Sequence, residues 1–185
     1  NNNSIATWDV SNITKLSYTF RSCTNFDVDI SGWNTSNVDD MIELFQNCSS
    51  FNQPIGNWDV SKVTRFGYFL FNASSFNQPL NNWDVSSCTT FSTMFYGASS
   101  FNQDIGDWDM SSTASGSGFK EMFRSATAYN NGGQPINWIT SPGVTDMALM
   151  FYNCLNFKQS LHSINITTLS NKIDFNHQVV LPTES

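Results

Sequence analysis

The sequence predicts an α/β repeat solenoid of about seven rungs, each formed by one 25-residue unit. The motif FNQP at residues 51–54 returns at residues 76–79, and the motif WDVS at residues 58–61 returns at residues 83–86. The six tryptophans lie 25, 25, 25, 25 and 30 residues apart. A fixed period of roughly 20–50 residues is typical of stacked arrays, in which each unit buries its apolar face against its neighbours.

Apolar residues recur at fixed places in every unit, which predicts one continuous core. The tryptophans form its central column, and we expect all six indoles to point inward and to stack in register. A second aromatic column lies eighteen residues after each of the first four tryptophans. The tryptophan column is Trp8, Trp33, Trp58, Trp83, Trp108 and Trp138, and the second column is Phe26, Phe51, Phe76, Phe101, Tyr129 and Phe157, with a shift where the chain carries insertions.

Two spacings alternate within each unit. After the WDVS motif, apolar residues lie three and four positions apart, which predicts a short helical turn. The stretch from the FNQ motif to the tryptophan is interrupted by Gly, Pro, Asn and Asp, which predicts extended chain and turns. Insertions at residues 111–118, 130–134 and 141–143 are rich in Gly, Ser, Asn or Pro, so we expect surface loops there.

We expect residues 1–185 to form a single solenoid domain. Regular repeats run from about residue 5 to about residue 163. The pattern degrades over residues 164–181, as is typical of a terminal capping repeat. At the other end, no cap precedes the unit that contains Ile5 and Trp8, so we expect another rung to cover it.

The consensus F-N-Q-x-I-x-x-W-D-V-S-x-V-T, followed by M-x-x-x-F-x-x-A, resembles the repeats of the BspA-like class of leucine-rich-repeat surface proteins. Residues 20–26 and 45–51 look like the A-F-x-x-C-x-x-L element of that class, and the similarity covers about residues 5–169. The resemblance implies a leucine-rich-repeat-like, right-handed stack with short parallel strands. It also implies an extracellular or cell-surface protein that acts in adhesion or protein binding. The class has no shared catalytic residues, and its ligands differ between members.

Charge and composition exclude several classes of partner. The net charge is −7 and the pI is near 4.4, whereas binding to nucleic-acid phosphates requires clustered Lys and Arg. The same charge disfavours an anionic membrane surface. No apolar run approaches the roughly 20 residues of a spanning helix, so we expect no membrane insertion. We also expect no cofactor.

An acidic column accompanies the tryptophans and has two interpretations. Stacked carboxylates are the ligands that calcium prefers. Alternatively, each side chain accepts backbone N–H bonds and so caps its own turn. We favour capping, because Asn34 occupies one place in the column and would weaken a metal site. The column is Asp9, Asn34, Asp59, Asp84 and Asp109. By similar reasoning, the asparagines of the repeated Asn-Gln pairs should form a ladder that satisfies backbone groups at a bend.

The four cysteines allow one disulfide pair. Cys23 and Cys48 occupy the same column on neighbouring rungs, where their Cα atoms could fall within disulfide distance. The column otherwise holds mainly alanine, so we expect this bridge to be unformed and the thiols to act as small buried groups. Cys88 and Cys154 have no partner by position, and we expect both to be free and buried. No CxxC spacing indicates a zinc site.

Six Asn-x-Ser/Thr sequons matter only if the source is a secreting eukaryote. They open at Asn2, Asn12, Asn34, Asn47, Asn72 and Asn165. We expect Asn12, Asn47 and Asn72 to be the glycosylated ones, because the column of Asn47 and Asn72 is otherwise polar. Asn34 should be bare, because it caps a turn.

The sequence therefore predicts a non-catalytic function. The only histidines, His162 and His177, lie in the degenerate end, and no nucleophile-elbow, zinc-protease or P-loop motif is present. We expect an extracellular or cell-surface structural or adhesive module that binds protein or glycan through an exposed repeat face. The uncapped N-terminal rung would allow end-to-end self-association into a filament.

Two alternatives come from other functional classes. The first is an ice- or mineral-binding surface made by the serine column that follows the acidic column, namely Ser11, Ser36, Ser61, Ser86 and Ser111. The second is a glycoside-active enzyme, which would require a groove with two facing carboxylates.

Overall fold

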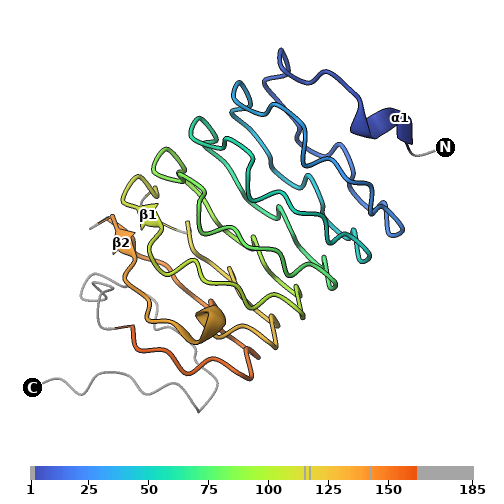
Figure 1. The fold of residues 1–185 in the computed structure, drawn as a ribbon. Coiled ribbons are helices and arrows are strands. Elements are labelled where there is room, and N and C mark those ends of the chain that lie inside the picture. Colours follow the sequence, from blue (N-terminus) through green and yellow to red (C-terminus); the bar gives the residue numbers. More distant parts are fainter. Residues whose placement is uncertain (1–2, 115, 117, 142, 162–185) are drawn as a thin grey trace, which may run out of the picture.

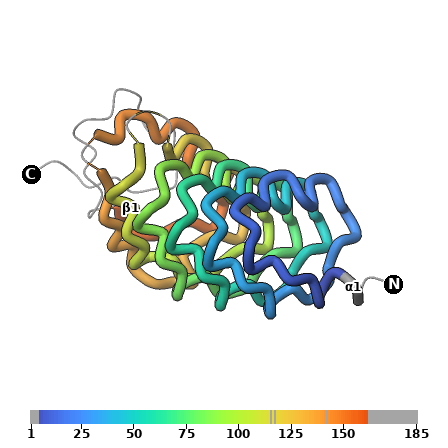
Figure 2. The backbone as a smooth tube through the Cα atoms, turned by 90° about the horizontal axis from the view of Figure 1, so that it is seen from above, coloured from blue at the N-terminus to red at the C-terminus, as the bar shows by residue number. Residues whose placement is uncertain are grey.

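Successive segments of the chain cross the molecule side by side, with the N-terminal segment at one end (Figure 1). Seen from above, the backbone winds through a series of similar loops (Figure 2). The computed structural model describes residues 3–114, 116, 118–141 and 143–161. The capping repeat expected at residues 164–181 lies outside the described residues, as do His162 and His177.

Few residues belong to regular elements. These are the helical turn α1 (Asn3–Ala6), the strand β1 (Asp109–Met110), the 3₁₀ turn η1 (Asn131–Gly133) and the strand β2 (Ile139–Thr140). β1 and β2 pair in parallel, with Asp109 opposite Ile139 and Met110 opposite Thr140. Isolated parallel bridges join Lys15, Asp40, Arg65 and Thr90 in succession, each one unit from the next. The chain is a compact domain with little regular secondary structure, two parallel strands and a large buried aromatic core.

The helical turns expected after each WDVS motif are wrong for the described residues. In residues 41–48 the backbone N–H groups alternate between two kinds of acceptor. Glu43 and Phe45 donate to the carbonyls of Gly67 and Phe69 in the next unit, both over 3.0 Å. Residues 44, 46 and 48 donate to the carbonyl three residues earlier, which closes tight turns. A helix would direct every N–H to a carbonyl four residues back and would leave no donors for the next unit.

This backbone path requires positive φ at two places in each unit. In the second unit they are Glu43, with φ 55°, and Asn47, with φ 60°. The N–H of Cys48 donates to the carbonyl of Phe45 and closes a four-residue turn in which Asn47 is the third residue. The third residue of a type II turn must lie in the left-handed region. Asn and Gly tolerate this region best, which explains the polar composition of the column. That column is Ser22, Asn47, Asn72, Gly97, Ser125 and Asn153, and all six have positive φ.

The core is a stack of aromatic rings drawn from successive units. The rings of Phe51 and Phe76 lie 5.8 Å apart and nearly parallel, and the indoles of Trp33 and Trp58 lie 6.2 Å apart. Five indoles are buried, and each donates its Nε1–H to the carbonyl of an Ile or Leu in the preceding unit; Trp58 donates to Ile30 over 3.1 Å. The other donor–acceptor pairs are Trp33–Ile5, Trp83–Ile55, Trp108–Leu80 and Trp138–Ile105.

The expectation that all six indoles point inward is wrong for Trp8, which is 53% exposed. Trp8 stacks on Trp33 at 6.5 Å, so one face of its ring is covered. It belongs to the first unit, and no described unit covers its other face or offers a carbonyl to its N–H. Its place in the stack therefore determines its exposure.

A ladder of asparagine side chains holds the bend at the FNQ motif, as the sequence predicts. The Oδ1 of Asn52 accepts the backbone N–H of Asn77, and the Oδ1 of Asn77 accepts that of Asn102, both over 2.9 Å. The ladder starts at Asp27, which accepts the N–H of Asn52, and continues through Asn130. Each rung therefore satisfies the backbone of the next at a place where no strand pairing is available.

Replacement of a buried indole should destabilise the fold far more than replacement of the exposed one. Trp58→Ala removes a fully packed ring and its hydrogen bond, so we expect a loss of about 3–5 kcal/mol in the free energy of unfolding. Trp8→Ala is the matched control, with an expected loss of about 1 kcal/mol or less. Chemical denaturation measures both. Equal losses would contradict the inward packing of the column.

Breaking the asparagine ladder should cost a measurable amount of stability. Asn77→Ala removes the acceptor for the N–H of Asn102 and for the side-chain amide of Gln103, which lies 2.9 Å away. We expect a loss of about 1–2 kcal/mol, because a half-buried donor is left without a partner. Asn57→Ala, at an exposed turn, is the control and should change stability by about 0.5 kcal/mol or less. A harmless Asn77→Ala in thermal unfolding would contradict a role for the ladder.

Candidate functional site

The acidic column caps turns, as favoured by the sequence analysis. The Oδ1 of Asp59 accepts the backbone N–H of Ser61 over 3.1 Å and its hydroxyl over 2.7 Å. These two bonds hold the pKa of Asp59 below its ordinary value. Asn34 accepts the N–H of Ser36 over 3.2 Å, so the amide performs the same task. Asp9, Asp84 and Asp109 repeat the arrangement with Ser11, Ser86 and Ser111. No group of three or more potential metal ligands occurs among the described residues.

Asp40 is a buried acid with hydrogen-bond donors around it. Burial raises the pKa of Asp40. The backbone N–H of Ile42 and the guanidinium of Arg65 lower it by a larger amount, so the pKa lies below its ordinary value. Asp40 therefore acts as a structural anion held by its neighbours.

Within the part of the chain that the structure describes, no helix is long and apolar enough to cross a membrane.

The predicted glycosylation residues occupy different environments. Asn12 and Asn72 are exposed, and Asn47 is half-buried. The side-chain amide of Asn72 donates to the Oδ1 of Asn47 over 3.0 Å, so the two side chains lie against each other on neighbouring units. Asn34 is engaged in its turn. Occupancy of Asn12, Asn47 and Asn72 stays a prediction.

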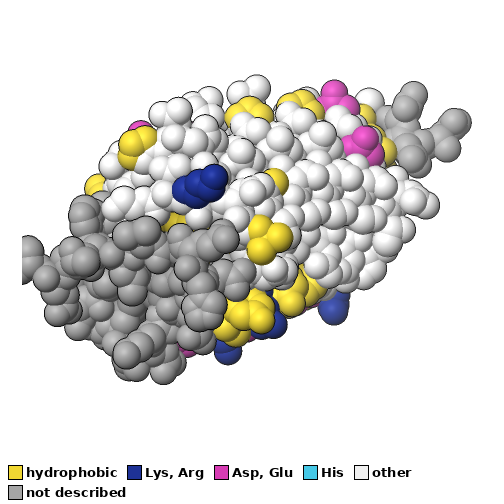
Figure 3. Space-filling view, turned by 90° about the horizontal axis from the view of Figure 1, so that it is seen from below, with side chains coloured by type: hydrophobic (Ala, Val, Ile, Leu, Met, Phe, Trp, Pro, Cys, Tyr) yellow, Lys and Arg dark blue, Asp and Glu magenta, His cyan; other side chains and the backbone are white. Residues whose placement is uncertain are grey.

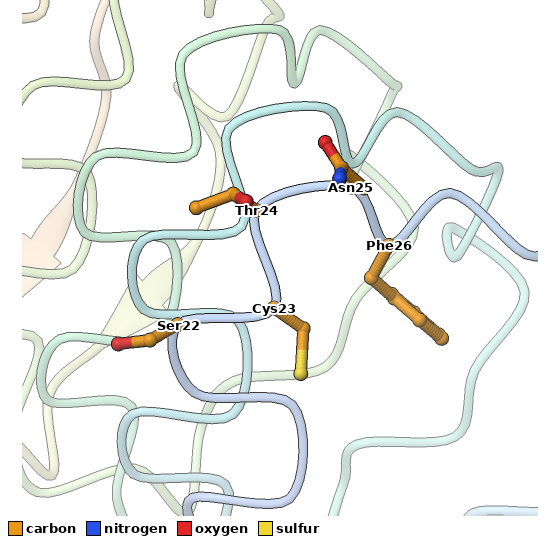
Figure 4. A pocket seen from close by; sticks show the side chains of 5 residues that line it. All are labelled: Ser22, Cys23, Thr24, Asn25 and Phe26. Atoms are coloured by element: carbon orange, nitrogen blue, oxygen red, sulfur yellow. The ribbon is translucent and has the colours of Figure 1, made fainter.

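The four cysteines are unbonded thiols. Cys48 is buried and donates its S–H to the carbonyl of Phe20 over 2.9 Å, so it packs against the first unit without a bridge to Cys23. Burial raises the pKa of Cys48, Cys88 and Cys154 to about 12 in each case. The expectation of a buried thiol is wrong for Cys23, which is exposed because it lies in the first unit. Cys23 lines an open pocket of about 400 Å³ together with Ser22, Thr24, Asn25 and Phe26 (Figure 4).

Thiol labelling should separate the exposed cysteine from the buried ones. We expect iodoacetamide at pH 8 to modify Cys23 alone in the native protein and all four thiols after denaturation, because the thiolate is the nucleophile. Intact mass spectrometry counts the adducts. Cys23→Ser should then take up no label in the native state. A rapid second adduct would contradict the burial of the other three thiols, and a missing pair of adducts after denaturation would indicate a disulfide.

One surface feature is unlike the rest of the molecule. Four aromatic side chains and one arginine form a continuous row across neighbouring units; we call Tyr68, Phe71, Tyr96, Arg124 and Tyr152 the outer aromatic row. Phe71 stacks on Tyr96 at 4.6 Å, and Tyr68 leans on Phe71 at 5.7 Å. Tyr68 and Tyr152, at the two ends, are 41% and 43% exposed. Aromatic and Arg residues are enriched in protein interfaces, and exposed apolar groups in a row indicate binding.

Arg124 is held within the row by two rings and an acid. Its guanidinium carbon lies 5.4 Å from the centroid of Tyr96 and 5.2 Å from that of Tyr152. Its Nη1 lies 3.5 Å from Oε1 of Glu121 one turn earlier. The two cation–π contacts restrain the guanidinium, and the Arg124 side chain is 30% exposed.

The row lies on the one part of the surface where charges balance. This outer turn face comprises the described residues within 14–24, 39–49, 64–74, 89–99, 114–127 and 143–155. It carries Lys15, Arg21, Arg65, Lys120 and Arg124 against Asp39, Asp40, Glu43, Glu121 and Asp146. All four ion pairs of the described residues lie on it. The remaining described residues carry eight acids and two lysines. Figure 3 shows hydrophobic side chains along both edges of a mostly uncharged, polar surface, with basic side chains near the hydrophobic ones at the lower edge and acidic ones at the upper edge.

The sequence analysis missed this row, although a signal was present. The column that contains four of its five members, all but Tyr68, reads Arg21, Gln46, Phe71, Tyr96, Arg124 and Tyr152. Its residue types vary, so it does not stand out as a repeat. Large aromatic residues in a column without a strict consensus, beside strictly apolar columns, would have indicated an exposed and specialised face.

Comparison with known proteins places the chain in a family. The sequence matches the family described as "Mycoplasma protein of unknown function, DUF285" over residues 1–108 and again over residues 82–178. The chain belongs to the DUF285 family. The two matches overlap and together span most of the chain, in keeping with its repeated units. No curated protein and no solved structure matches the chain. The DUF285 description names no activity or ligand, so function rests on the surface described above.

Proposed function

We propose that this DUF285 chain is a non-catalytic, leucine-rich-repeat-like solenoid of about seven rungs, which acts as an extracellular or cell-surface binding module. The outer aromatic row is the observation that carries the proposal. A row of exposed rings with a fixed arginine, on a charge-balanced face of an acidic protein, fits recognition of a protein or a glycan. An adhesive or structural role at the cell surface follows from such a module.

The solenoid assignment draws support from the contacts between units. Backbone and indole hydrogen bonds join residues 24 to 28 positions apart through units of regular length, as a stack of equivalent rungs requires. The BspA-like resemblance adds the right-handed, leucine-rich-repeat-like form and the surface location. Both remain parts of the proposal.

The alternatives draw less support from the same residues. The hydroxyls of Ser61 and Ser86 donate to their own aspartates over 2.7 and 2.6 Å, so they are turned away from the free array that ice or mineral would need. The acids that recur between units accept N–H bonds within their turns, which disfavours their use as a glycosidase pair.

The exposed first unit supports end-to-end association as part of the proposal. Trp8 is 53% and Ile13 39% exposed, whereas the equivalent Trp33 and Val38 are buried beneath the first unit. Another rung laid on this end, from an upstream repeat of the same polypeptide or from another subunit, would cover both side chains and accept the N–H of Trp8. A contact of this head-to-tail kind that does not close produces a filament.

A binding screen tests the proposed function. The wild-type protein is applied to a glycan array and to an array of cell-surface proteins, beside the Tyr96→Ser/Tyr152→Ser variant. We expect at least one ligand class to bind, and the double variant to lose about tenfold or more in affinity, because interface rings dominate binding energy. Tyr18→Ser changes an equally exposed tyrosine outside the row and should bind as the wild type does.

Circular dichroism melting of each variant checks that the fold is intact. Ligand binding that is equal in all three proteins would contradict the role of the row. Hydrolysis of an arrayed glycan by the wild type would contradict the non-catalytic assignment.

A further inference from the structure

We propose that the outer aromatic row binds an extended protein segment rather than a glycan, and that an acidic side chain of this segment pairs with Arg124. The inference rests on the proposed function and narrows its ligand to one class. It follows from how the rings of the row are oriented and from which charges surround them.

The rings in the middle of the row have neighbours against their faces, whereas Tyr68 and Tyr152 at the ends are partly open. Tyr96 has Phe71 stacked on one face at 4.6 Å and the guanidinium of Arg124 over the other at 5.4 Å. The other face of Arg124 is covered by Tyr152 at 5.2 Å. A sugar binds aromatic residues by lying flat on an open ring face, and the middle of the row offers none. The ring edges and phenol hydroxyls that remain suit side chains and backbone groups of a protein.

Arg124 presents unused donors at the centre of this surface. A guanidinium has five N–H donors in a planar fork. Glu121 engages Nη1 at 3.5 Å, and no acceptor among the described residues takes the others. The guanidinium carbon lies over both tyrosine rings, and the side chain of Arg124 is 30% exposed, so a carboxylate can reach its remaining donors.

The charge around the row is close to neutral, and one of its bases is free of an ion pair among the described residues. In the part of the outer turn face formed by residues 64–74, 89–99, 114–127 and 143–155, the bases are Arg65, Lys120 and Arg124 and the acids are Glu121 and Asp146. Arg65 pairs with Asp40 of the neighbouring unit, whereas exposed Lys120 has no ion-pair partner among the described residues. The rest of the molecule is strongly acidic, so an acidic segment meets the least repulsion here.

The dimensions of the row define the length of the segment. The row crosses four units spaced about 4.8 Å apart, which gives roughly 15 Å. An extended chain rises about 3.3 Å per residue, so about five residues cover it. An extended segment along the row would place apolar side chains against Tyr68, Phe71 and Tyr152 and the acid at Arg124.

An array of immobilised peptides tests the inference. The peptides share one scaffold and differ only in a central Leu-Glu-Leu, Leu-Gln-Leu or Leu-Lys-Leu core, and the array also carries cellohexaose and chitohexaose. We expect the wild-type protein to prefer the Glu core by about tenfold, since a bidentate charged hydrogen bond contributes that much. Arg124→Gln should abolish this preference while the protein still melts at the wild-type temperature within a few degrees.

Arg21→Gln is the matched control. Arg21 lies in the same column and also pairs with a glutamate, Glu43, at 3.2 Å, but the next residue of that column is not aromatic. It should keep the wild-type preference. The inference is overturned if Arg124→Gln keeps the preference, if no peptide binds, or if light scattering shows that wild-type copies pair through the row and Tyr96→Ser prevents it. Binding of the hexasaccharides through Tyr96 would overturn the inference and leave the proposed function standing. If the wild-type protein binds neither the peptides nor the hexasaccharides, both the inference and the proposed function are contradicted.

Discussion

The interaction on which this structure depends is the hydrogen bond from the backbone of one unit to the backbone of the next. The N–H groups of Glu43 and Phe45 reach Gly67 and Phe69, and the equivalent Tyr68 and Leu70 reach Ser92 and Met94 in turn. A single unit has too few internal partners to satisfy these groups, and a buried unsatisfied N–H costs about as much as a lost hydrogen bond. Each unit therefore depends on its neighbours for these hydrogen bonds, and units of nearly constant length keep donor and acceptor in register.

This constraint explains why the aromatic columns exist and how the core tolerates exceptions. Because equivalent residues are brought to a fixed spacing, rings of successive units stack at about 6 Å, as Phe26, Phe51 and Phe76 do. Where Leu70 replaces the ring of its column, Phe69 turns edge-on to Phe45 at 5.4 Å and to Trp83 at 5.8 Å. A neighbouring column therefore supplies the missing aromatic volume. The core therefore stays filled even though one column does not carry the same residue type in every unit.

Much of this arrangement could be predicted from sequence, because columns with strict identity report direct contacts between units. The capping role of Asp59 and the ladder through Asn52 and Asn77 followed from residue type and period alone. The prediction of helical turns was wrong, because a spacing of three and four residues between apolar positions fits both a helix and a series of tight turns. Only the direction of the N–H groups distinguishes the two. The exposure of Trp8 depended on its place at the end of the stack, which a repeat pattern does not contain.

The outer aromatic row could not be predicted for a different reason. Its members do not repeat, since the stack requires no particular residue in that column. Freedom from the packing constraint is what allows Phe71, Tyr96, Arg124 and Tyr152 to differ from their equivalents, and it makes them available for the recognition proposed above. In a protein whose core is set by repetition, the irregular exposed positions are therefore the ones that carry information about a partner.

The most direct test of the stack is hydrogen exchange at the six indole N–H groups, measured by NMR on the ¹⁵N-labelled protein. The account predicts five indoles that exchange slowly, because Trp33, Trp58, Trp83, Trp108 and Trp138 each donate to a carbonyl of the preceding unit. It predicts one fast indole, Trp8. Rapid exchange at any of the interior tryptophans, or at several together, would contradict the pairing of each unit with the next.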